Sequence, residues 1–297
     1  MNFFPSRWPI MCAVMNSVSD MTLACAVHEA GAMPSLLVNW KKIDRDYDLL
    51  NSSLNEFVKS TGSNHVVIQL DYTDLKDDIV LNMIEHYKIS HIELFGLMGL
   101  PRHREQQEFD LVMRAHRPQF QRLRKTARII TRIFTPSSGQ GIDAYALKGS
   151  DSAGLSGMMS VKELFIQQQQ STPSMPLVPY GGVGTPEQVA WYINNGAAGV
   201  AVGTLFAATK ESCINDLTKQ AMIASTDQDL AKLSSHQQAL VLGTVSNDPN
   251  HQQSLNDGIA GTGGLIYAGK SINHVKEIKT VKQVVDYLTQ DLVRQII

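Results

Sequence analysis

Residues 176–206, with the sequence PLVPYGGVGTPEQVAWYINNGAAGVAVGTLF, constrain the fold more than any other part of the chain. An apolar run ends in Gly181-Gly182. Thr185-Pro186-Glu187 then begins a helix with a hydroxyl N-cap, a proline at the first helical position and an acid in the first turn. Gly196 ends that helix, and 199–202 reads as a short strand of small residues. The order strand, helix, strand is that of a parallel β/α unit.

Glycines follow both strands of this unit, as Gly181-Gly182 and as Gly203-Thr204. Turns of this kind at the C-terminal ends of parallel strands expose backbone N–H groups on one face. A (β/α)₈ barrel commonly uses the loops after its seventh and eighth strands in this way to hold a phosphate. We therefore expect a phosphate site here. The alternative is that these glycines only permit tight turns.

Strand and helix patterns alternate along the rest of residues 1–213, which predicts an α/β fold with a parallel sheet, specifically a (β/α)₈ TIM barrel. The predicted strands are 10–14, 33–38, 66–70, 91–95, 128–134, 143–147, 177–180 and 200–202. The predicted helices are 20–30, 49–60, 75–87, 106–117, 161–168 and 185–195.

One unit of the predicted barrel is incomplete, because only residues 135–142 separate the fifth and sixth strands. A parallel crossover usually contains a dozen or more residues and a helix. Eight extended residues span roughly 26 Å, which is enough to run back along a strand as a bare loop. We expect the barrel to lack the helix between strands five and six. The alternative is that the fifth strand is misassigned and its unit lies within 120–134.

The tail, residues 214–297, does not repeat the barrel unit and predicts a C-terminal helical extension. Residues 217–223 and 281–293 have helical patterns, and the glycine-rich stretch 258–269 lies between them. That stretch lacks the Lys-Ser/Thr pair of a P-loop, so we interpret it as a lid or packing loop near the barrel mouth. The predicted organisation is a barrel over 1–213 with the extension packed on it.

Composition excludes several functional classes. The chain has 297 residues, 43% of them hydrophobic and 18% charged, and its net charge of −2 argues against a nucleic-acid-binding surface. No apolar run is long enough for a membrane span, and the N-terminus does not resemble a signal peptide. Cys12, Cys25 and Cys213 show no metal-ligand spacing. They predict a reducing, cytoplasmic location and no metal site.

Several segments together resemble the nitronate monooxygenase family, the FMN-dependent barrels formerly called 2-nitropropane dioxygenases, which include FMN-dependent enoyl-acyl-carrier-protein reductases. The segments that carry the resemblance are 9–31, 66–70, 146–157, 178–212 and 258–272. The resemblance implies an FMN-dependent oxidoreductase that oxidises alkyl nitronates or related small substrates with oxygen. Three alternatives stay open: an NAD(P)H-dependent enoyl-acyl-carrier-protein reductase, a degenerate flavin-binding barrel without turnover, and an aldolase-like barrel.

The resemblance also implies which residues contact FMN. Gln69 stands where the family usually has an asparagine that contacts FMN, and Lys148 stands where it often has a glutamine. The residues implied to line the flavin ring or its surroundings are Ala13, Val14, Met15, Ala153 and Gly154. Those implied to hold the phosphate are Gly181, Gly182, Ala201, Val202, Gly203 and Thr204.

The loop after the sixth strand departs from the family at the position of its catalytic base. Where the family has a histidine, this chain has Leu155, which cannot accept a proton. Asp151 is the nearest substitute, although the turn-capping role is the interpretation we favour for it. For Lys148 the alternatives are a donor to the flavin and a Schiff-base amine. Tyr180 is either a hydrogen-bond donor or a packing residue.

Arginine and lysine side chains concentrate between residues 114 and 132. The simpler interpretation is a solvated helix face, because helix surfaces routinely carry such charges without a partner. The alternative is a docking patch for an acidic acyl carrier protein, which would favour the enoyl-reductase branch. The expected partners are otherwise a small-molecule substrate and either oxygen or NAD(P)H.

Overall fold

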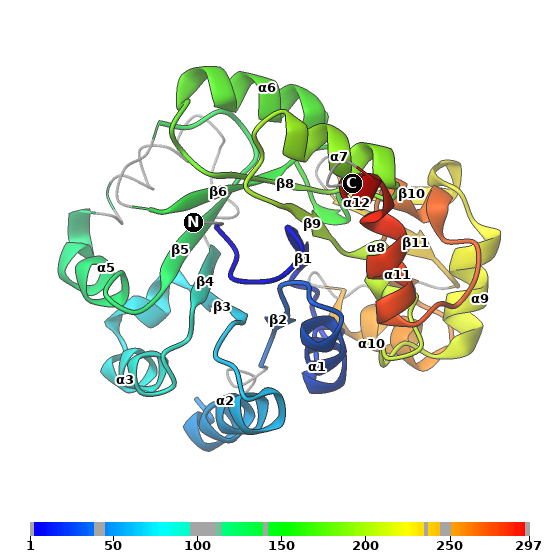
Figure 1. The fold of residues 1–297 in the computed structure, drawn as a ribbon. Helices are drawn as coiled ribbons and strands as arrows, with labels where there is room; N and C mark the ends of the chain where they lie inside the picture. The colour runs from blue at the N-terminus through cyan, green and yellow to red at the C-terminus, as the bar shows by residue number, and fades with distance from the viewer. Residues whose placement is uncertain are drawn as a thin grey trace.

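The computed structural model describes residues 3–38, 45–95, 111, 114–138, 142–234, 237–243 and 251–294. Eight strands form a parallel sheet in the order β1-β9-β8-β6-β5-β4-β3-β2, and a Met11–Met33 bridge joins its two ends. The predicted (β/α)₈ barrel is therefore confirmed, and Figure 1 shows its helices arranged around the strands. The strands are β1 (Ile10–Cys12), β2 (Ser35–Leu36), β3 (Val67–Asp71), β4 (His91–Phe95), β5 (Arg128–Ile133), β6 (Ala144–Lys148), β8 (Leu177–Tyr180) and β9 (Val200–Val202).

The helices of the barrel begin where the sequence supplies a capping side chain. The Asp20 carboxylate accepts from the Leu23 amide, and the Thr185 hydroxyl accepts from the Gln188 amide, so each satisfies a free N–H of a first turn. The predicted helix 106–117 falls largely outside the described residues. The described helical segments around the barrel are α1 (Met21–Glu29), α2 (Tyr47–Thr61), η1 (Tyr72–Lys76), α3 (Asp78–His86), α5 (Arg117–Leu123), α6 (Val161–Ser171), α7 (Pro186–Asn194) and α8 (Thr204–Ala207).

The crossover from β5 to β6 is a bare loop in its described residues, as the sequence predicts. β5 pairs with β4 on one side and with β6 on the other, so its assignment as the fifth strand is confirmed. Gln168 of α6 is fully buried and holds this loop: its amide nitrogen donates to the Ser137 carbonyl at 2.7 Å and its oxygen accepts from the Ser137 amide at 2.8 Å. A glutamine thus supplies the hydrogen bonds that the loop cannot make within a helix.

Side chains alternate between two cores along each strand. Outward residues such as Cys12, Val200 and Val202 pack under the helices. Inward residues fill the barrel, where Phe3 and Phe4 pack with small and branched side chains of the strands. Because the strand period is two, the last inward position of each strand faces the cavity at the C-terminal end of the barrel.

The extension combines helices with a small antiparallel sheet that the sequence did not predict. β10 (Leu230–Ser234), β11 (Gln237–Val241) and β12 (Leu265–Ile266) form this sheet, and β11 also pairs with β7 (Gly154–Leu155) in the loop after β6. The extension is therefore attached at the barrel mouth. Its helical segments are α9 (Asp216–Ala224), η2 (Asp227–Asp229), α10 (Gln252–Ala260), η3 (Lys270–His274), α11 (Val281–Leu288) and α12 (Gln290–Arg294).

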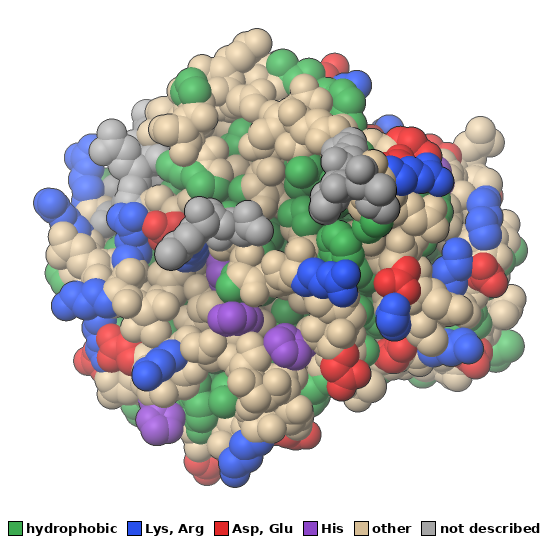
Figure 2. Space-filling model, in the orientation of Figure 1, with side chains coloured by type: hydrophobic (Ala, Val, Ile, Leu, Met, Phe, Trp, Pro, Cys, Tyr) green, Lys and Arg blue, Asp and Glu red, His purple; other side chains and the backbone are tan. Residues whose placement is uncertain are grey.

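Acidic and basic side chains are interspersed over the face of the molecule shown in Figure 2, and hydrophobic side chains appear there in scattered groups. Two arginines of the basic cluster around α5 form ion pairs at the surface. Arg122 binds Glu85 and Asp78, Arg124 binds Asp143, and the side chain of Arg132 lies inside the barrel. Among the described helices, none has the length and apolar character needed to cross a membrane.

Candidate active site

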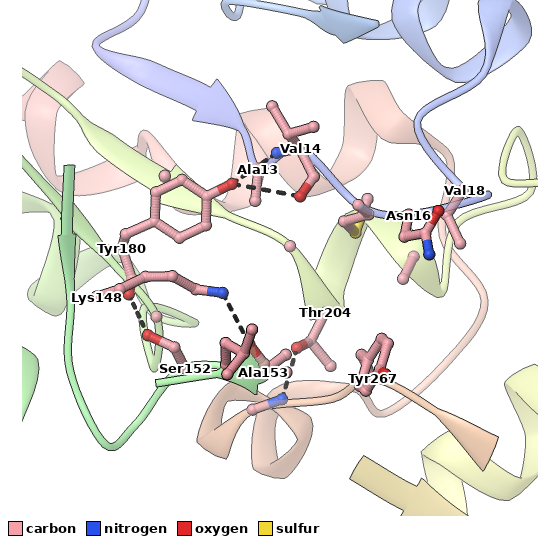
Figure 3. A pocket seen from close by; sticks show the side chains of 18 of the residues that line it. Ala13, Val14, Asn16, Val18, Lys148, Ser152, Ala153, Tyr180, Thr204 and Tyr267 are labelled. Atoms are coloured by element: carbon pink, nitrogen blue, oxygen red, sulfur yellow. Dashed lines mark hydrogen bonds between the residues drawn. The ribbon is translucent and has the colours of Figure 1, made fainter. Parts of the chain in front are cut away.

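A cavity of about 560 Å³ lies at the C-terminal end of the barrel strands. Its wall is formed by the ends of the strands, by the loops after β6, β8 and β9, and by Leu255, Ile266 and Tyr267 of the extension. Figure 3 shows side chains from these different segments converging on it. The volume and the mixed apolar and polar lining are those of a small-molecule site.

The residues predicted to contact FMN lie together around this cavity, with one exception. The exception is Val202, whose side chain faces the outer core and whose carbonyl accepts from the Ala13 amide at 2.9 Å. The predicted residues that line the cavity are Ala13, Val14, Met15, Gln69, Lys148, Ala153, Gly154, Gly181, Gly182, Ala201, Gly203 and Thr204. Leu155, at the position of the family histidine, also lines it.

The two glycine turns in the cavity wall contain backbone donors that have no acceptor among the described residues. The amides of Gly182, Val183, Gly203 and Thr204 donate to no acceptor within the described part of the chain, and all four residues line the cavity. The Thr204 hydroxyl accepts from the Gly269 amide at 3.1 Å, which leaves its own hydrogen available. Grouped N–H donors of this kind suit an anionic oxygen.

The glycines of the first turn are required by the fold as well. Gly182 has φ +73°, and a Cβ there would lie 2.8 Å from the Cβ of Asp151. Gly203, by contrast, has φ −114°, and its Cβ would meet only Ala13 and Met15, at 3.3 Å and 3.6 Å. A side chain at residue 203 therefore enters the cavity, whereas one at residue 182 displaces the neighbouring loop.

Asp151 lies behind the first glycine turn and does not line the cavity. Its carboxylate accepts from the Lys270 ammonium at 2.7 Å and from the Val161 amide at 2.9 Å. Both contacts tie the loop after β6 to neighbouring elements. The placement favours the turn-capping interpretation of Asp151 over the general-base interpretation.

A buried ion pair lies in the cavity wall beside the predicted residues. The Arg132 guanidinium of β5 pairs with the Glu93 carboxylate of β4, whose side chain is fully buried. Arg132 also lies 5.2 Å from the ring centroids of Phe95 and Tyr180 and donates to the Tyr180 hydroxyl at 3.4 Å. Burial of a charge pair is costly unless the partners are well oriented, so this pair is a specific feature of the site.

Lys148 occupies the last position of β6 and extends into the cavity. Its ammonium donates to the Ala153 carbonyl at 2.9 Å and lies 5.5 Å from the centroid of the Tyr180 ring (Figure 3). Burial lowers the pKa of Lys148 to about 7, with the Arg132 charge lowering it further and Glu93 opposing this. The side chain can therefore exist as a free amine near neutral pH.

Tyr180, at the end of β8, contacts the segment that follows β1 in the cavity wall. Its hydroxyl accepts from the Val14 amide at 2.7 Å and lies 3.4 Å from the Val14 carbonyl. Burial, and next the Glu93 charge, raise the pKa of Tyr180 well above its ordinary value. Tyr180 therefore keeps its proton and fixes the segment predicted to face the flavin.

Sequence reasoning missed Glu93 and Arg132 as site residues, although a signal was present. Both are charged residues at inward positions, near the C-terminal ends of the strands HIELF and RIITRI. When Arg132 is grouped with the basic residues near it in the sequence, it is interpreted as part of an exposed cluster and not as a buried side chain. The period-two pattern of the strand identifies it as buried.

Comparisons with known proteins agree with this architecture. The family model described as nitronate monooxygenase matches residues 128–253. A search of curated protein sequences found no significant match. Among solved structures, a nitroalkane oxidase from Streptomyces ansochromogenes is similar at a TM-score of 0.75 and 19% identity, covering 98% of each chain.

Two further solved structures share the fold. FabK from Thermotoga maritima has a TM-score of 0.74 at 19% identity and covers 98% of this chain and 94% of its own. The enoyl reductase domain of MlnA from Bacillus amyloliquefaciens has a TM-score of 0.66 at 10% identity, covering 99% and 97%. The family match confirms the resemblance seen in the sequence: this chain is an oxidoreductase that resembles the nitronate monooxygenases, with the family model covering residues 128–253.

Proposed function

We propose that this chain is an FMN-dependent oxidoreductase that oxidises alkyl nitronates or related small substrates with oxygen. The observation that carries the proposal is the pair of glycine turns, where four residues that line the cavity have amides without an acceptor in the described part of the chain. A terminal phosphate would accept hydrogen bonds from Gly182, Val183, Gly203 and Thr204. The flavin, when bound, supplies the redox chemistry by accepting electrons from the substrate and passing them to oxygen.

The remaining cavity residues fit a flavin ring. The backbone of Ala13, Val14 and Met15 offers a flat wall, held in place by the Tyr180 hydroxyl. Gln69 and Lys148 line the cavity with side chains able to donate to ring oxygens or nitrogens. The Arg132 guanidinium and the Lys148 amine line the cavity with N–H donors, which suits the oxygens of a nitronate.

The unpaired cysteines fit the location proposed for such an enzyme. Cys12, Cys25 and Cys213 are all free thiols, and Cys12 is buried. Free thiols persist in reducing compartments. We therefore place the enzyme in the cytoplasm. Arg122 and Arg124 are engaged with acidic neighbours, so we favour a small-molecule substrate over docking of an acyl carrier protein.

FMN uptake tests the proposal directly. The purified protein should be yellow, or become so with added FMN, and acid should release a non-covalent flavin identified as FMN. Gly203→Val should weaken FMN binding at least about tenfold, because the side chain enters the phosphate cradle without backbone strain. Binding is measured by flavin fluorescence, and circular dichroism checks folding. A folded Gly203→Val protein with undiminished affinity would refute the cradle.

Substrate assays distinguish the candidate reactions. Ethylnitronate should be consumed with oxygen uptake, whereas oxidation of NAD(P)H by an enoyl thioester would support the reductase alternative. Flavin binding without either activity would support the degenerate barrel, for which Leu155 is the structural argument. A colourless protein that takes up no FMN would refute the proposed function.

A further inference from the structure

We propose that the Lys148 amine is the group that removes a proton from a neutral nitroalkane in this cavity, in place of the histidine that Leu155 replaces. The inference rests on the proposed function, because it names the base for the same site. The roles expected for Lys148 from the sequence were a donor to the flavin and a Schiff-base amine, and neither is that of a general base.

The geometry places the Lys148 nitrogen where a base is needed. Lys148 lies at the end of β6 and lines the cavity, and only 8% of its surface is exposed to solvent. One of its hydrogens is directed to the carbonyl of Ala153, two residues before Leu155. The Lys148 amine therefore lies beside the loop after β6, which carries the base in the nitronate monooxygenase family. Lys148 itself belongs to the strand and not to that loop.

The charges around Lys148 favour its neutral form. Arg132 is a neighbouring cation whose own charge is already paired with Glu93. A second cation at Lys148 would share that single buried carboxylate, and burial opposes it as well, which together bring the pKa of Lys148 to about 7. Arg132 and Glu93 are the charged groups that act on Lys148, and Asp71, Tyr180 and Tyr267 are further titratable residues of the cavity wall.

The other titratable groups near the cavity are less suited to the role. Asp151 faces away and is paired with Lys270, and Tyr180 keeps its proton. Arg132 stays protonated under all ordinary conditions. The Asp71 carboxylate lines the cavity but accepts from the Thr73 amide at 2.8 Å, which commits one oxygen to capping η1. Asp71 is the rival candidate that the experiment must separate.

The proton transfer balances without any further reactant. The C–H bond next to the nitro group breaks, its electron pair delocalises onto the nitro oxygens, and the proton forms a new N–H bond at Lys148. The products are a nitronate anion and an ammonium group, beside the Arg132 guanidinium. The two positive charges stabilise the anion as it forms. The ammonium later returns its proton to solvent.

Exchange of the α-deuterium of labelled nitroethane with water, followed by NMR without oxygen, measures this step apart from oxidation. In the unmodified protein the exchange rate above background should rise as pH increases through about 7 and then level off, as Lys148 loses its proton. A rate that is flat between pH 6 and 8 would overturn the proposal. This arm requires no variant.

Three variants and a control locate the base. Lys148→Met removes the amine, and Lys148→Arg keeps a cation that cannot deprotonate. Both should lower exchange by about 10²–10⁴-fold, the usual contribution of a general base. Lys162→Met, which removes a lysine outside the cavity, should leave exchange unchanged. Loss of exchange in Asp71→Asn with retention in both folded Lys148 variants would transfer the role to Asp71 and refute the proposal.

The same data separate this proposal from the proposed function. Exchange that depends on Lys148 in a protein that never takes up FMN would support the base and refute the flavin enzyme. If the protein oxidises nitronates with FMN and Lys148→Met leaves exchange unchanged, the flavin enzyme is supported and Lys148 is refuted as the base. Leu155→His in the Lys148→Met background should restore exchange, because it returns a titratable group to the family position.

Discussion

Among single residues, His91 should make the stability of the fold depend on pH. It lies at the start of β4, packs against Phe3 and Phe4, and interacts through Nε2 with the Phe3 carbonyl at 3.2 Å. Burial lowers the pKa of His91 to about 4, and the Phe3 carbonyl only partly opposes this. The native state therefore keeps His91 neutral at a pH where the unfolded chain binds a proton.

The sign of the effect follows from that difference. The contribution of neutral His91 to the free energy of unfolding is fully present above pH 6.5 and decreases as the pH falls toward 4. At pH 4.5 the loss is about 2–3 kcal/mol. His91→Gln should remove this part of the dependence, measured as the difference in urea unfolding free energy between pH 7 and pH 4.5. The control variant His86→Gln, at an exposed histidine, should leave this pH dependence unchanged. An equal pH dependence in His91→Gln and the unmodified protein would contradict the assignment.

Residue positions were predictable where a backbone pattern determined them. The glycine turns predicted the phosphate site, because the C-terminal ends of parallel strands meet at one edge, whereas the residues expected around the flavin ring were implied by the family resemblance. Roles set by a neighbour from elsewhere in the chain were not predictable. The Lys270 ammonium binds the Asp151 carboxylate outside the cavity. Lys270 lies 119 positions after Asp151, so the sequence around Asp151 does not predict this contact.

Among the elements, the bare crossover between β5 and β6 should depend on one side chain of α6. Gln168→Leu removes both hydrogen bonds to the Ser137 backbone while keeping similar volume. Because Ser137 then loses buried partners, we expect a loss of about 1–3 kcal/mol in the free energy of unfolding. Chemical denaturation measures it. The exposed Gln170→Leu is the control and should change stability by less than about 0.5 kcal/mol.

The run of four glutamines also shows what a composition argument misses. Residues 167–170 look uniformly polar and solvent-facing, yet Gln168 is fully buried within α6. The helical repeat places it on the same face as Leu164 and Phe165. Strands β10 and β11 escaped prediction for a related reason: they are short, half-exposed and rich in polar residues, so no alternation marks them.

For the whole chain, we expect residues 1–213 and 214–294 to unfold as one cooperative unit. β11 pairs with β7 in the loop after β6, and the Gly269 amide donates a hydrogen bond to the Thr204 hydroxyl. The buried residues of α11 are Val281, Val284, Val285 and Leu288. A chain ending at residue 213 would lose all of these contacts and should aggregate or lack a cooperative melt. Two separate transitions of the full chain in calorimetry would contradict this expectation.

The short crossover has a consequence for the order of folding. Residues 134–143 separate β5 from β6, whereas 149–176 separate β6 from β8. Closing a loop costs about 0.6 kcal/mol less for each halving of its length, so β5 and β6 can pair at roughly 1 kcal/mol less entropy cost than the next pair of strands. Local pairing of this kind lowers contact order and tends to form early. We therefore expect β5 and β6, the strands that carry Arg132 and Lys148, to pair early in the folding of the barrel.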